Sequence, residues 1–504
     1  MEAVARGPLR RRARPPLGAL LAPARGLVRP LAAAVGLLAL ALFLVEAPLS
    51  LAALALVGAM GGVALLLRPA LGLYALAFAV PFGSLREFGV GGVSVGASEL
   101  LVAAVLGAWA ARMAVTRRVD VVRTPLTLAV LGYIGALALG LLPATALTPA
   151  LKELVKWIEF LVVYTTVASL PDGDEGRRLV RGLVAALLLA GLAEGLLGAY
   201  QFLHGVGPPG FILMGRYMRA HGTFQQPNPY GGYLGLLLPL AYGTVLAEWR
   251  AAWGAIRAGR PRGAWLWALA GVSGGVMLAG LVMSWSRGAL LGLVAGAGIV
   301  FLSLGRRAWA ALAAAALVLA LLGPGSIEAL PGDLVGRVTE TFAYVALPDL
   351  TALEIDDANF SVVERAAHWL AAWRMFSRAP WLGVGTGQYA TVYPSVALPR
   401  WQDPLGHAHN YYLNVLAEGG LLGLGAYLLM LWVALRAAWR AVGECTGWRR
   451  GLALGALGML GYIAAHSAFD NLYVHEMYLL VATILGLAAW ARGREAPETT
   501  GVGP

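Results

Sequence analysis

The sequence predicts an all-α polytopic membrane protein with about fourteen transmembrane helices and one large, partly helical loop outside the cytoplasm. Three observations predict this fold. Hydrophobic residues make up 59% of the 504 residues and charged residues only 13%, which is far more apolar than an ordinary globular domain. Apolar runs of about 16–25 residues recur along the chain. Basic residues cluster in the short loops between these runs.

Each apolar run is close to the length that crosses about 30 Å of hydrocarbon. Each must be helical, because lipid offers no hydrogen-bond partner to an unpaired backbone amide. The predicted spans are 31–46, 50–67, 69–83, 97–115, 125–146, 149–170, 179–203, 228–247, 264–283, 287–304, 308–323, 411–436, 451–468 and 474–491. Turns of only a few residues separate the first three spans, and joining neighbours there gives twelve or thirteen helices instead.

The basic clusters orient the helices. Residues 1–30 carry seven arginines and no small-residue cleavage site after a short apolar core, which predicts a retained cytoplasmic tail. Threading the spans from this tail places the basic clusters at 117–118, 177–178, 257–262, 306–307 and 449–450 in the cytoplasm. The expected organisation is a tail at 1–30, helices across 31–323 with an outer loop at 204–227, a large outer loop at 324–410, three helices across 411–491, and a cytoplasmic tail at 492–504.

Charge and cysteine content exclude two classes of function. The net charge is +11, but the basic residues follow the positive-inside pattern of a membrane protein, so no nucleic-acid partner is expected. The single cysteine, Cys445, excludes an internal disulfide and a cysteine-rich metal site.

The large outer loop contains one predicted helix. Apolar residues recur at helical spacing from Ser361 to Arg378, with tryptophans on the same face, which predicts a helix at the membrane interface. Gly383, Gly385 and Gly387 then alternate as in a dinucleotide-binding loop. No strand precedes them, so we reject a nucleotide site.

Arginines outside the cytoplasm run against the charge rule. Arg216, Arg219 and His221 lie in the outer loop 204–227, and Arg287 lies between two apolar spans with almost no loop. One interpretation is that these arginines anchor lipid headgroups or extend towards the membrane surface. The other is an anion site, because a guanidinium offers a planar fork that matches phosphate oxygens.

A histidine pair precedes the span that begins at residue 411. Asn410 is a candidate helix cap, and Glu418 lies more than two turns inside the span. His407 and His409 have a spacing that can bind zinc, but no nearby residue supplies a third and a fourth ligand. The sequence therefore predicts no metal site here, and it favours an acid/base role for the histidines.

Both lysines of the protein lie on adjacent turns of the span 149–170. Intramembrane charge is costly, so Lys156 is expected to pair with Glu159 across one turn. Lys152 lies near the outer end of the span and is placed to join the arginines.

Four stretches together resemble the bacterial O-antigen ligase and O-antigen polymerase superfamily. They are RAHGTFQQPNPYGGYL, SWSRGALLGL, ERAAHWLAAWRMFSRAPWLGVGTGQY and HAHNYYLNVLAEGGLLGLGAYLL, which begin at residues 219, 284, 364 and 407. They occur in the order of the family, and the resemblance spans about residues 150–490. The spans near the N-terminus add little to it, and fourteen helices exceed the twelve typical of the ligases.

The resemblance implies a metal-independent, cofactor-free, inverting glycosyltransferase of the bacterial inner membrane. Such enzymes move a glycan from undecaprenyl diphosphate to an acceptor hydroxyl at the periplasmic face. It implies that His409 is the general base and that Arg219 and Arg287 bind the diphosphate. Arg216 and Lys152 would help to bind the diphosphate. The supporting residues would be His407, Asn410, Tyr411, Glu418 and His221.

The identity of the acceptor stays open. Lipid A core, a second carrier-linked repeat, and a protein or other polymer would all be served by one donor site. A transporter of lipid-linked sugars is the alternative from another class. Transporters place polar residues near the bilayer midplane, often with internal repeats. Here the polar residues gather at one face and no repeat is visible.

Overall fold

The structure is a computed structural model that describes residues 60–65, 68, 70–83, 87–90, 93–116, 122–213, 215–310, 313–314 and 360–493. The chain divides into two units, residues 1–67 and residues 68–504. Of the first unit only residues 60–65 are described, and they are helical. The predicted spans 31–46, 50–67 and 308–323 lie wholly or largely outside the described residues, so the total number of spans is not established.

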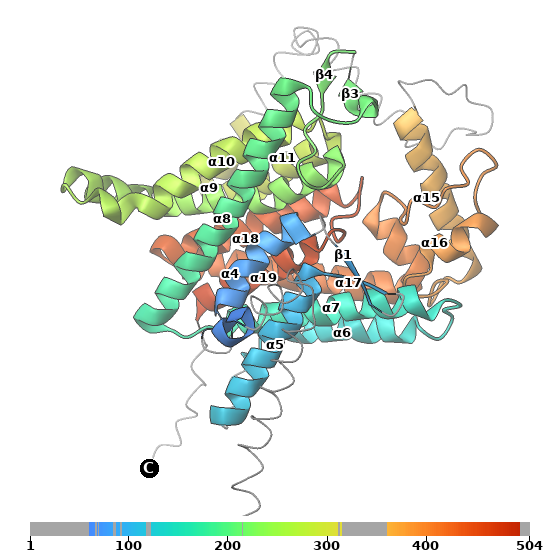
Figure 1. Cartoon of the computed structure of the whole chain (residues 1–504), viewed down its shortest axis with the longest axis horizontal. Coiled ribbons are helices and arrows are strands. Elements are labelled where there is room, and N and C mark those ends of the chain that lie inside the picture. Colours follow the sequence, from blue (N-terminus) through green and yellow to red (C-terminus); the bar gives the residue numbers. More distant parts are fainter. Residues whose placement is uncertain are drawn as a thin grey trace, which may run out of the picture. The chain divides into compact units, whose positions relative to one another are not determined.

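The second unit is almost entirely helical, as predicted (Figure 1). Its α-helices are α4 Ala70–Phe82, α5 Ala97–Thr116, α6 Pro125–Leu139, α7 Leu147–Ala168, α8 Gly173–His204, α9 Pro227–Arg257, α10 Trp265–Met283, α11 Arg287–Ser303, α15 Phe360–Arg378, α16 Tyr389–Val392, α17 Tyr411–Glu444, α18 Gly447–His466 and α19 Met477–Arg492. Short 3-10 turns are η2 Pro209–Phe211, η3 Pro261–Ala264 and η4 Tyr393–Ser395. Two small antiparallel hairpins complete it, β1 Glu87–Val90 with β2 Val93–Gly96 and β3 Ile212–Leu213 with β4 Tyr217–Met218.

Several helices meet the requirements of a membrane span. Among the described residues, four helical segments of 18 or more residues are apolar enough to cross a bilayer: Gly173–His204, Pro227–Arg257, Pro261–Met283 and Tyr411–Glu444. Shorter apolar helices are Ala70–Phe82, Pro125–Leu139, Arg287–Ser303 and Met477–Arg492. These helices confirm the prediction of a polytopic membrane protein, because lipid accepts apolar helices of this length.

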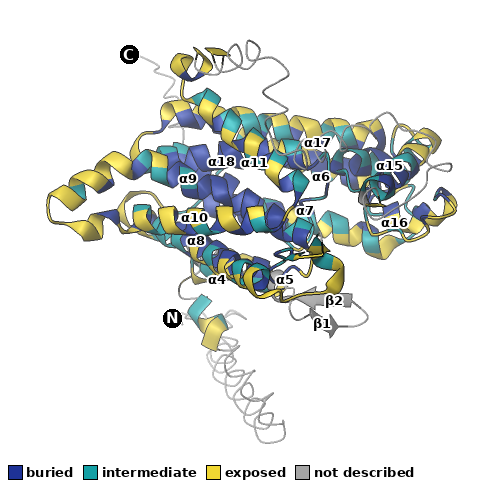
Figure 2. Cartoon of the chain, turned by 90° about the horizontal axis from the view of Figure 1, so that it is seen from above, coloured by how far each residue is buried: buried dark blue, intermediate teal, exposed yellow. Residues whose placement is uncertain are grey.

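Helix α18 forms the centre of the bundle. Its residues 451–463 are buried without interruption, and it packs against α9, α11, α17 and α19. Figure 2 shows α18 as a mainly buried ribbon among more exposed helices. A helix buried on all sides is apolar all round, which explains why its sequence lacks an amphipathic pattern.

Helix α17 is interrupted at Gly420, which has φ 61° and ψ −158°. The interruption leaves main-chain groups that residues 380–385 satisfy. Val384 N–H donates to Ala417 O at 2.9 Å, and Leu421 N–H donates to Pro380 O at 2.8 Å. Gly420 therefore turns the chain so that residues 380–385 can dock on α17.

The docked segment also binds the turn between α6 and α7. Gln388 accepts hydrogen bonds from Thr145 N–H at 3.1 Å and Ala146 N–H at 2.9 Å, and donates to Ala146 O at 2.8 Å. Glu418 accepts from Gly387 N–H and Tyr389 N–H. The loop with Gly383, Gly385 and Gly387 therefore has a structural role, because its hydrogen bonds attach α15 and α16 to the bundle.

We expect Gly420→Ala to destabilise the protein by about 2 kcal/mol or more, because alanine is strained at this positive φ. A β-carbon would also lie 2.4 Å from the carbonyl carbon of Trp381. Gly419→Ala is the matched control, since nothing lies within 4 Å of its β-carbon position and its φ is not positive. Thermal unfolding in detergent should separate the two variants, and equal midpoints would contradict the role given to the break.

Candidate active site

One end of the bundle, here called the histidine end, contains the starts of α9, α11 and α17 and the end of α18. Tyr411 N–H donates to Ser467 O at 2.8 Å, which joins the start of α17 to the end of α18. A β-carbon on Gly288 would lie 2.9 Å from His466 Cδ2, so the start of α11 lies against the same helix end. Helix starts carry partial positive charge from unpaired N–H groups.

The three starts share one backbone geometry. The residue before each N-cap has a positive φ although it is not glycine: Gln225 at 57°, Trp285 at 52° and His409 at 49°. Ser286 and Asn410 then cap α11 and α17 through their side chains. This confirms Asn410 as the cap of α17. Left-handed backbone at residues other than glycine is costly and is concentrated at functional sites.

The left-handed backbone turns His409 into a cluster with His407 and Asp470. His409 Nδ1 lies 3.5 Å from Asp470 Oδ1. His409 N–H donates to His407 Nδ1 at 3.1 Å, and Ala408 N–H donates to Asn414 Oδ1 at 3.0 Å. Both ring nitrogens of His409 are buried, and neither forms a well-aligned hydrogen bond with a described residue. The main-chain hydrogen bond to His407 and the nearby Asp470 carboxylate thus hold the imidazole in place.

Burial and neighbouring charges shift the pKa values of Asp470 and His407 in this cluster. Burial of Asp470 raises its pKa, but contact with His409 and the charges of His407 and His466 outweigh that effect, so the net pKa lies well below its usual value. Burial lowers the pKa of His407 to about 4 despite the nearby Asp470. Asp470 is therefore ionised and His407 neutral near pH 7.

Asp470 and His466 were missed by the sequence reasoning. Both lie at the boundary of the predicted span 451–468, within the polar sequence HSAFDN. Polar residues at such a boundary were an available signal, but they lie about sixty residues from His409 along the chain. Only the packing of α17 against α18 brings them together.

Arg219 is fixed beside the start of α11. Its Nε donates to Ser284 O at 2.9 Å, and its Nη2 donates to Asn228 Oδ1 at 3.1 Å. Arg287 is the first residue of α11 and is half-buried. Residues far apart in the sequence therefore place both predicted diphosphate-binding arginines at the histidine end.

Two side chains of α8 hold the loop that carries Arg219. The Gln201 side chain accepts from Gly222 N–H at 2.7 Å, and buried Glu194 accepts from Thr223 N–H at 3.1 Å. Gly222 has φ 55°, and a β-carbon there would lie 2.2 Å from Glu194 Oε2. The glycine and threonine that follow Arg219 are thus needed to seat the loop on α8.

Other predicted site residues take different places. Arg216 is exposed at the turn of the β3–β4 hairpin, with its guanidinium 5.2 Å from the Tyr217 ring centroid. The His221 ring packs on Phe211 at 5.4 Å between centroids. Lys152 is exposed on α7. No contact that the structure records among the described residues joins these three to the histidine cluster.

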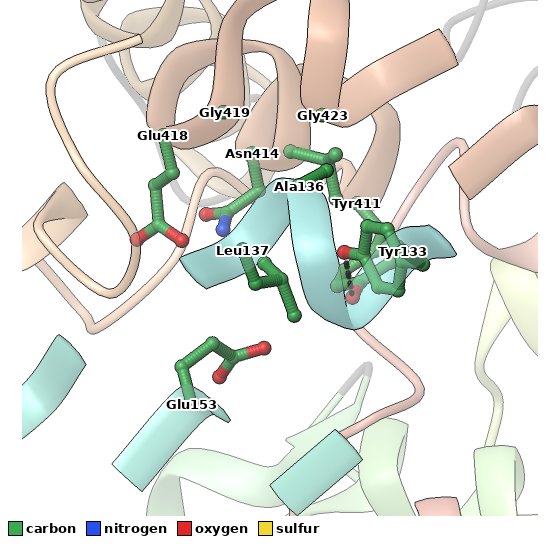
Figure 3. Close-up of a pocket in the computed structure, with 10 residues that line it drawn as sticks. Tyr133, Ala136, Leu137, Glu153, Tyr411, Asn414, Glu418, Gly419 and Gly423 are labelled. Carbon is green, nitrogen blue, oxygen red and sulfur yellow. Dashed lines mark hydrogen bonds between the residues drawn. The ribbon is translucent and has the colours of Figure 1, made fainter. Parts of the chain in front are cut away.

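Tyr411 and Glu418 line a small pocket between α6, α7 and α17. Figure 3 shows the Glu418 and Glu153 carboxylates near the Asn414 side chain, with the Tyr411 hydroxyl directed at Tyr133. Asn414 links this pocket to the histidine loop through Ala408. Tyr411 and Glu418 therefore lie in the pocket on which the loop 407–409 rests through Asn414, and among the described residues neither has a recorded contact with His409.

The prediction that Lys156 pairs with Glu159 was wrong, because Lys156 pairs with Glu153. Lys156 Nζ lies 2.6 Å from Glu153 Oε2. The Tyr478 hydroxyl donates to Glu159 instead. The i,i+3 spacing exists on both sides of Lys156, and packing of α19 on α7 decides which glutamate remains for the lysine.

The expectation that no third ligand accompanies His407 and His409 was wrong. Asp470 supplies a third ligand that was not visible near the histidine pair in the sequence. One ligand atom each of His407, His409 and Asp470 lie within 4.8 Å of one another. This set has the donor types of a zinc site with an open position.

Residues 272–428 match the family described as O-Antigen ligase. The matched segment includes Arg287, His407 and His409, whereas Arg219 and Asp470 lie outside it. No curated protein matches the chain significantly.

His368 of α15 predicts an acid-sensitive fold. Burial lowers its pKa from 6.5 to about 4. As the pH falls, the unfolded chain binds this proton first, so the stabilisation is complete above about 6.5 and is lost towards 4. We expect the unfolding midpoint to drop by several degrees between pH 7.5 and pH 4.5. The drop should be smaller in His368→Phe, and an equal drop would contradict the assignment.

Proposed function

Because residues 272–428 belong to the O-antigen ligase family of glycosyltransferase-type enzymes, we propose that the protein moves a glycan from undecaprenyl diphosphate to an acceptor hydroxyl. The observation that supports this most is the placement of His409 and Asp470 at the same end of the bundle as Arg219 and Arg287. Base and cations are the two requirements of a transfer from a diphosphate carrier without a metal.

The proposed reaction is a single displacement with inversion. His409 removes the proton of the acceptor hydroxyl as that oxygen attacks the anomeric carbon. The bond from this carbon to the diphosphate oxygen breaks, and undecaprenyl diphosphate leaves with the electron pair. Arg219, Arg287 and the start of α11 stabilise the charge that grows on the leaving oxygen. Arg216 and Lys152 are exposed and would act only on the approach of the donor.

Asp470 orients the proposed base. Its carboxylate lies nearest to His409 Nδ1, so it favours the tautomer with the proton on that nitrogen. Nε2 would then be the nitrogen that accepts the proton of the hydroxyl. The neutral His407 holds the backbone of His409 rather than competing for the proton.

We propose that the histidine end faces the periplasm. The basic loops assign the opposite ends of the helices to the cytoplasm. Both chain ends would then be cytoplasmic, and the enzyme would lie in the inner membrane of a bacterium. The favoured acceptor is lipid A core, which makes the enzyme a ligase, and polymerisation onto a second carrier-linked glycan would use the same donor site.

Substitutions at the site should separate chemistry from folding. In proteoliposomes with undecaprenyl-diphosphate-linked glycan, we expect His409→Ala to lower kcat at least a hundredfold. Arg287→Ala and Arg219→Ala should lower it tenfold to a hundredfold, and Asp470→Asn about tenfold. Arg250→Ala is the control, since this exposed arginine lies near the other end of α9, over Trp249. Full transfer by His409→Ala would exclude it as the base.

Metal removal tests the one alternative mechanism that the site suggests. We expect activity to be unchanged after dialysis against EDTA, because the diphosphate is already a good leaving group and the arginines supply the positive charge. Activity that is lost in EDTA and restored by added Zn²⁺ would instead assign His407, His409 and Asp470 as metal ligands.

A further inference from the structure

One face of α15 leads towards the proposed base. Phe360, Glu364 and His368 follow one another at intervals of four residues, so their side chains lie on the same side of the helix. The His368 ring meets the His409 ring edge-on, with centroids 5.7 Å apart. This stripe therefore begins at the first residue of α15 and finishes at His409.

A second segment lies beside the stripe. The Trp401 ring packs on Phe360 at 5.1 Å between centroids. Tyr393 stacks on His368 at 4.7 Å and donates from its hydroxyl to Trp401 O at 2.9 Å, which ties this segment to α15. Asp403 follows two residues later and is exposed. Aromatic rings and a carboxylate thus come from both segments.

Glu364 lies within electrostatic range of both the base and Asp403. Burial raises its pKa, the charges of His409 and Arg365 lower it, and Asp403 raises it further. No hydrogen bond or ion pair to a described residue is recorded for the Glu364 carboxylate. Phe360 is 47% exposed, which leaves part of its ring uncovered at the end of the stripe.

We propose that Phe360, Glu364 and Asp403 form the binding subsite for a neutral sugar residue of the acceptor. This inference rests on the proposed function and names the substrate class of its second site. Sugar hydroxyls donate hydrogen bonds to carboxylates, and the apolar face of a pyranose packs on an aromatic ring. A sugar held by Glu364 would present a neighbouring hydroxyl to His409.

The charges at the two sides of the base fit different substrates. Arg219 and Arg287 attract the anionic diphosphate of the donor. Arg365 offsets part of the negative charge, and the two carboxylates leave a net negative charge, so Glu364 and Asp403 select against an acceptor that ends in a uronic acid or a phosphorylated sugar. The same charges keep the donor diphosphate from binding in the acceptor position.

The experiment measures acceptor kinetics in proteoliposomes that contain undecaprenyl-diphosphate-linked glycan. Two synthetic lipid-linked acceptors are compared, one ending in a neutral hexose and one in the matching uronic acid. We expect Glu364→Gln and Phe360→Ala each to raise the KM for the neutral acceptor tenfold or more. Donor KM should be unchanged, and kcat should stay within about threefold. Trp373→Ala is the control, because this exposed tryptophan lies nine residues from Glu364, on the opposite side of α15.

The preference between acceptors gives a second readout. Wild type should prefer the neutral acceptor, and the double variant Glu364→Gln, Asp403→Asn should lose most of that preference. Unchanged acceptor KM in the variants, or equal use of both acceptors by wild type, would overturn the subsite while leaving the transferase intact. Failure of wild type to transfer to any acceptor would overturn the proposed function and the subsite with it.

Discussion

The starts of three helices at one end of the bundle impose the constraint on which the rest of the site depends. The first turns of α9, α11 and α17 leave N–H groups without carbonyl partners, and such groups cannot face lipid. They must meet water, capping side chains or an anion. Ser286 and Asn410 satisfy part of this need, and the residue before each cap has a positive φ. An anionic substrate at this end would accept hydrogen bonds from the helix-start N–H groups that the caps leave unpaired.

The site also depends on how a broken helix joins two parts of the chain. The break in α17 exposes carbonyls at 417 and 418, and these accept main-chain hydrogen bonds from residues 384 and 385. Glu418 adds a side-chain link to the same segment. Because these bonds hold α15 against the bundle, His368 can lie edge-on to His409. Gly420 and Glu418 therefore have a structural role inside this apolar helix, because they attach residues 380–389 to α17.

Sequence reasoning succeeded where the bilayer dictates the answer. Apolar length located α8, α9, α10 and α17, and helical spacing located α15, because both follow from local patterns. It failed for Asp470 and for Gln201, whose roles arise only from contacts between distant segments. The lysine pair failed for a similar reason, since Lys156 had a glutamate at equal spacing on each side and the tertiary partner of Glu159 was not visible.

Under the proposed function, the arrangement of charges around His409 would let one imidazole act on two different ligands. Arg219 and Arg287 come from segments that lie in the bundle, whereas the carboxylates at 364 and 403 come from α15 and the segment that follows it, where Arg365 offsets part of their charge. A diphosphate approaching from the membrane and a sugar approaching from outside would each meet the charge that suits it. The Asp470 carboxylate lies 3.5 Å from His409 Nδ1, and in the proposed reaction it would stabilise the imidazolium that forms when His409 takes the hydroxyl proton. Reversal of either set of charges would leave the base in place but would direct both ligands to the same side.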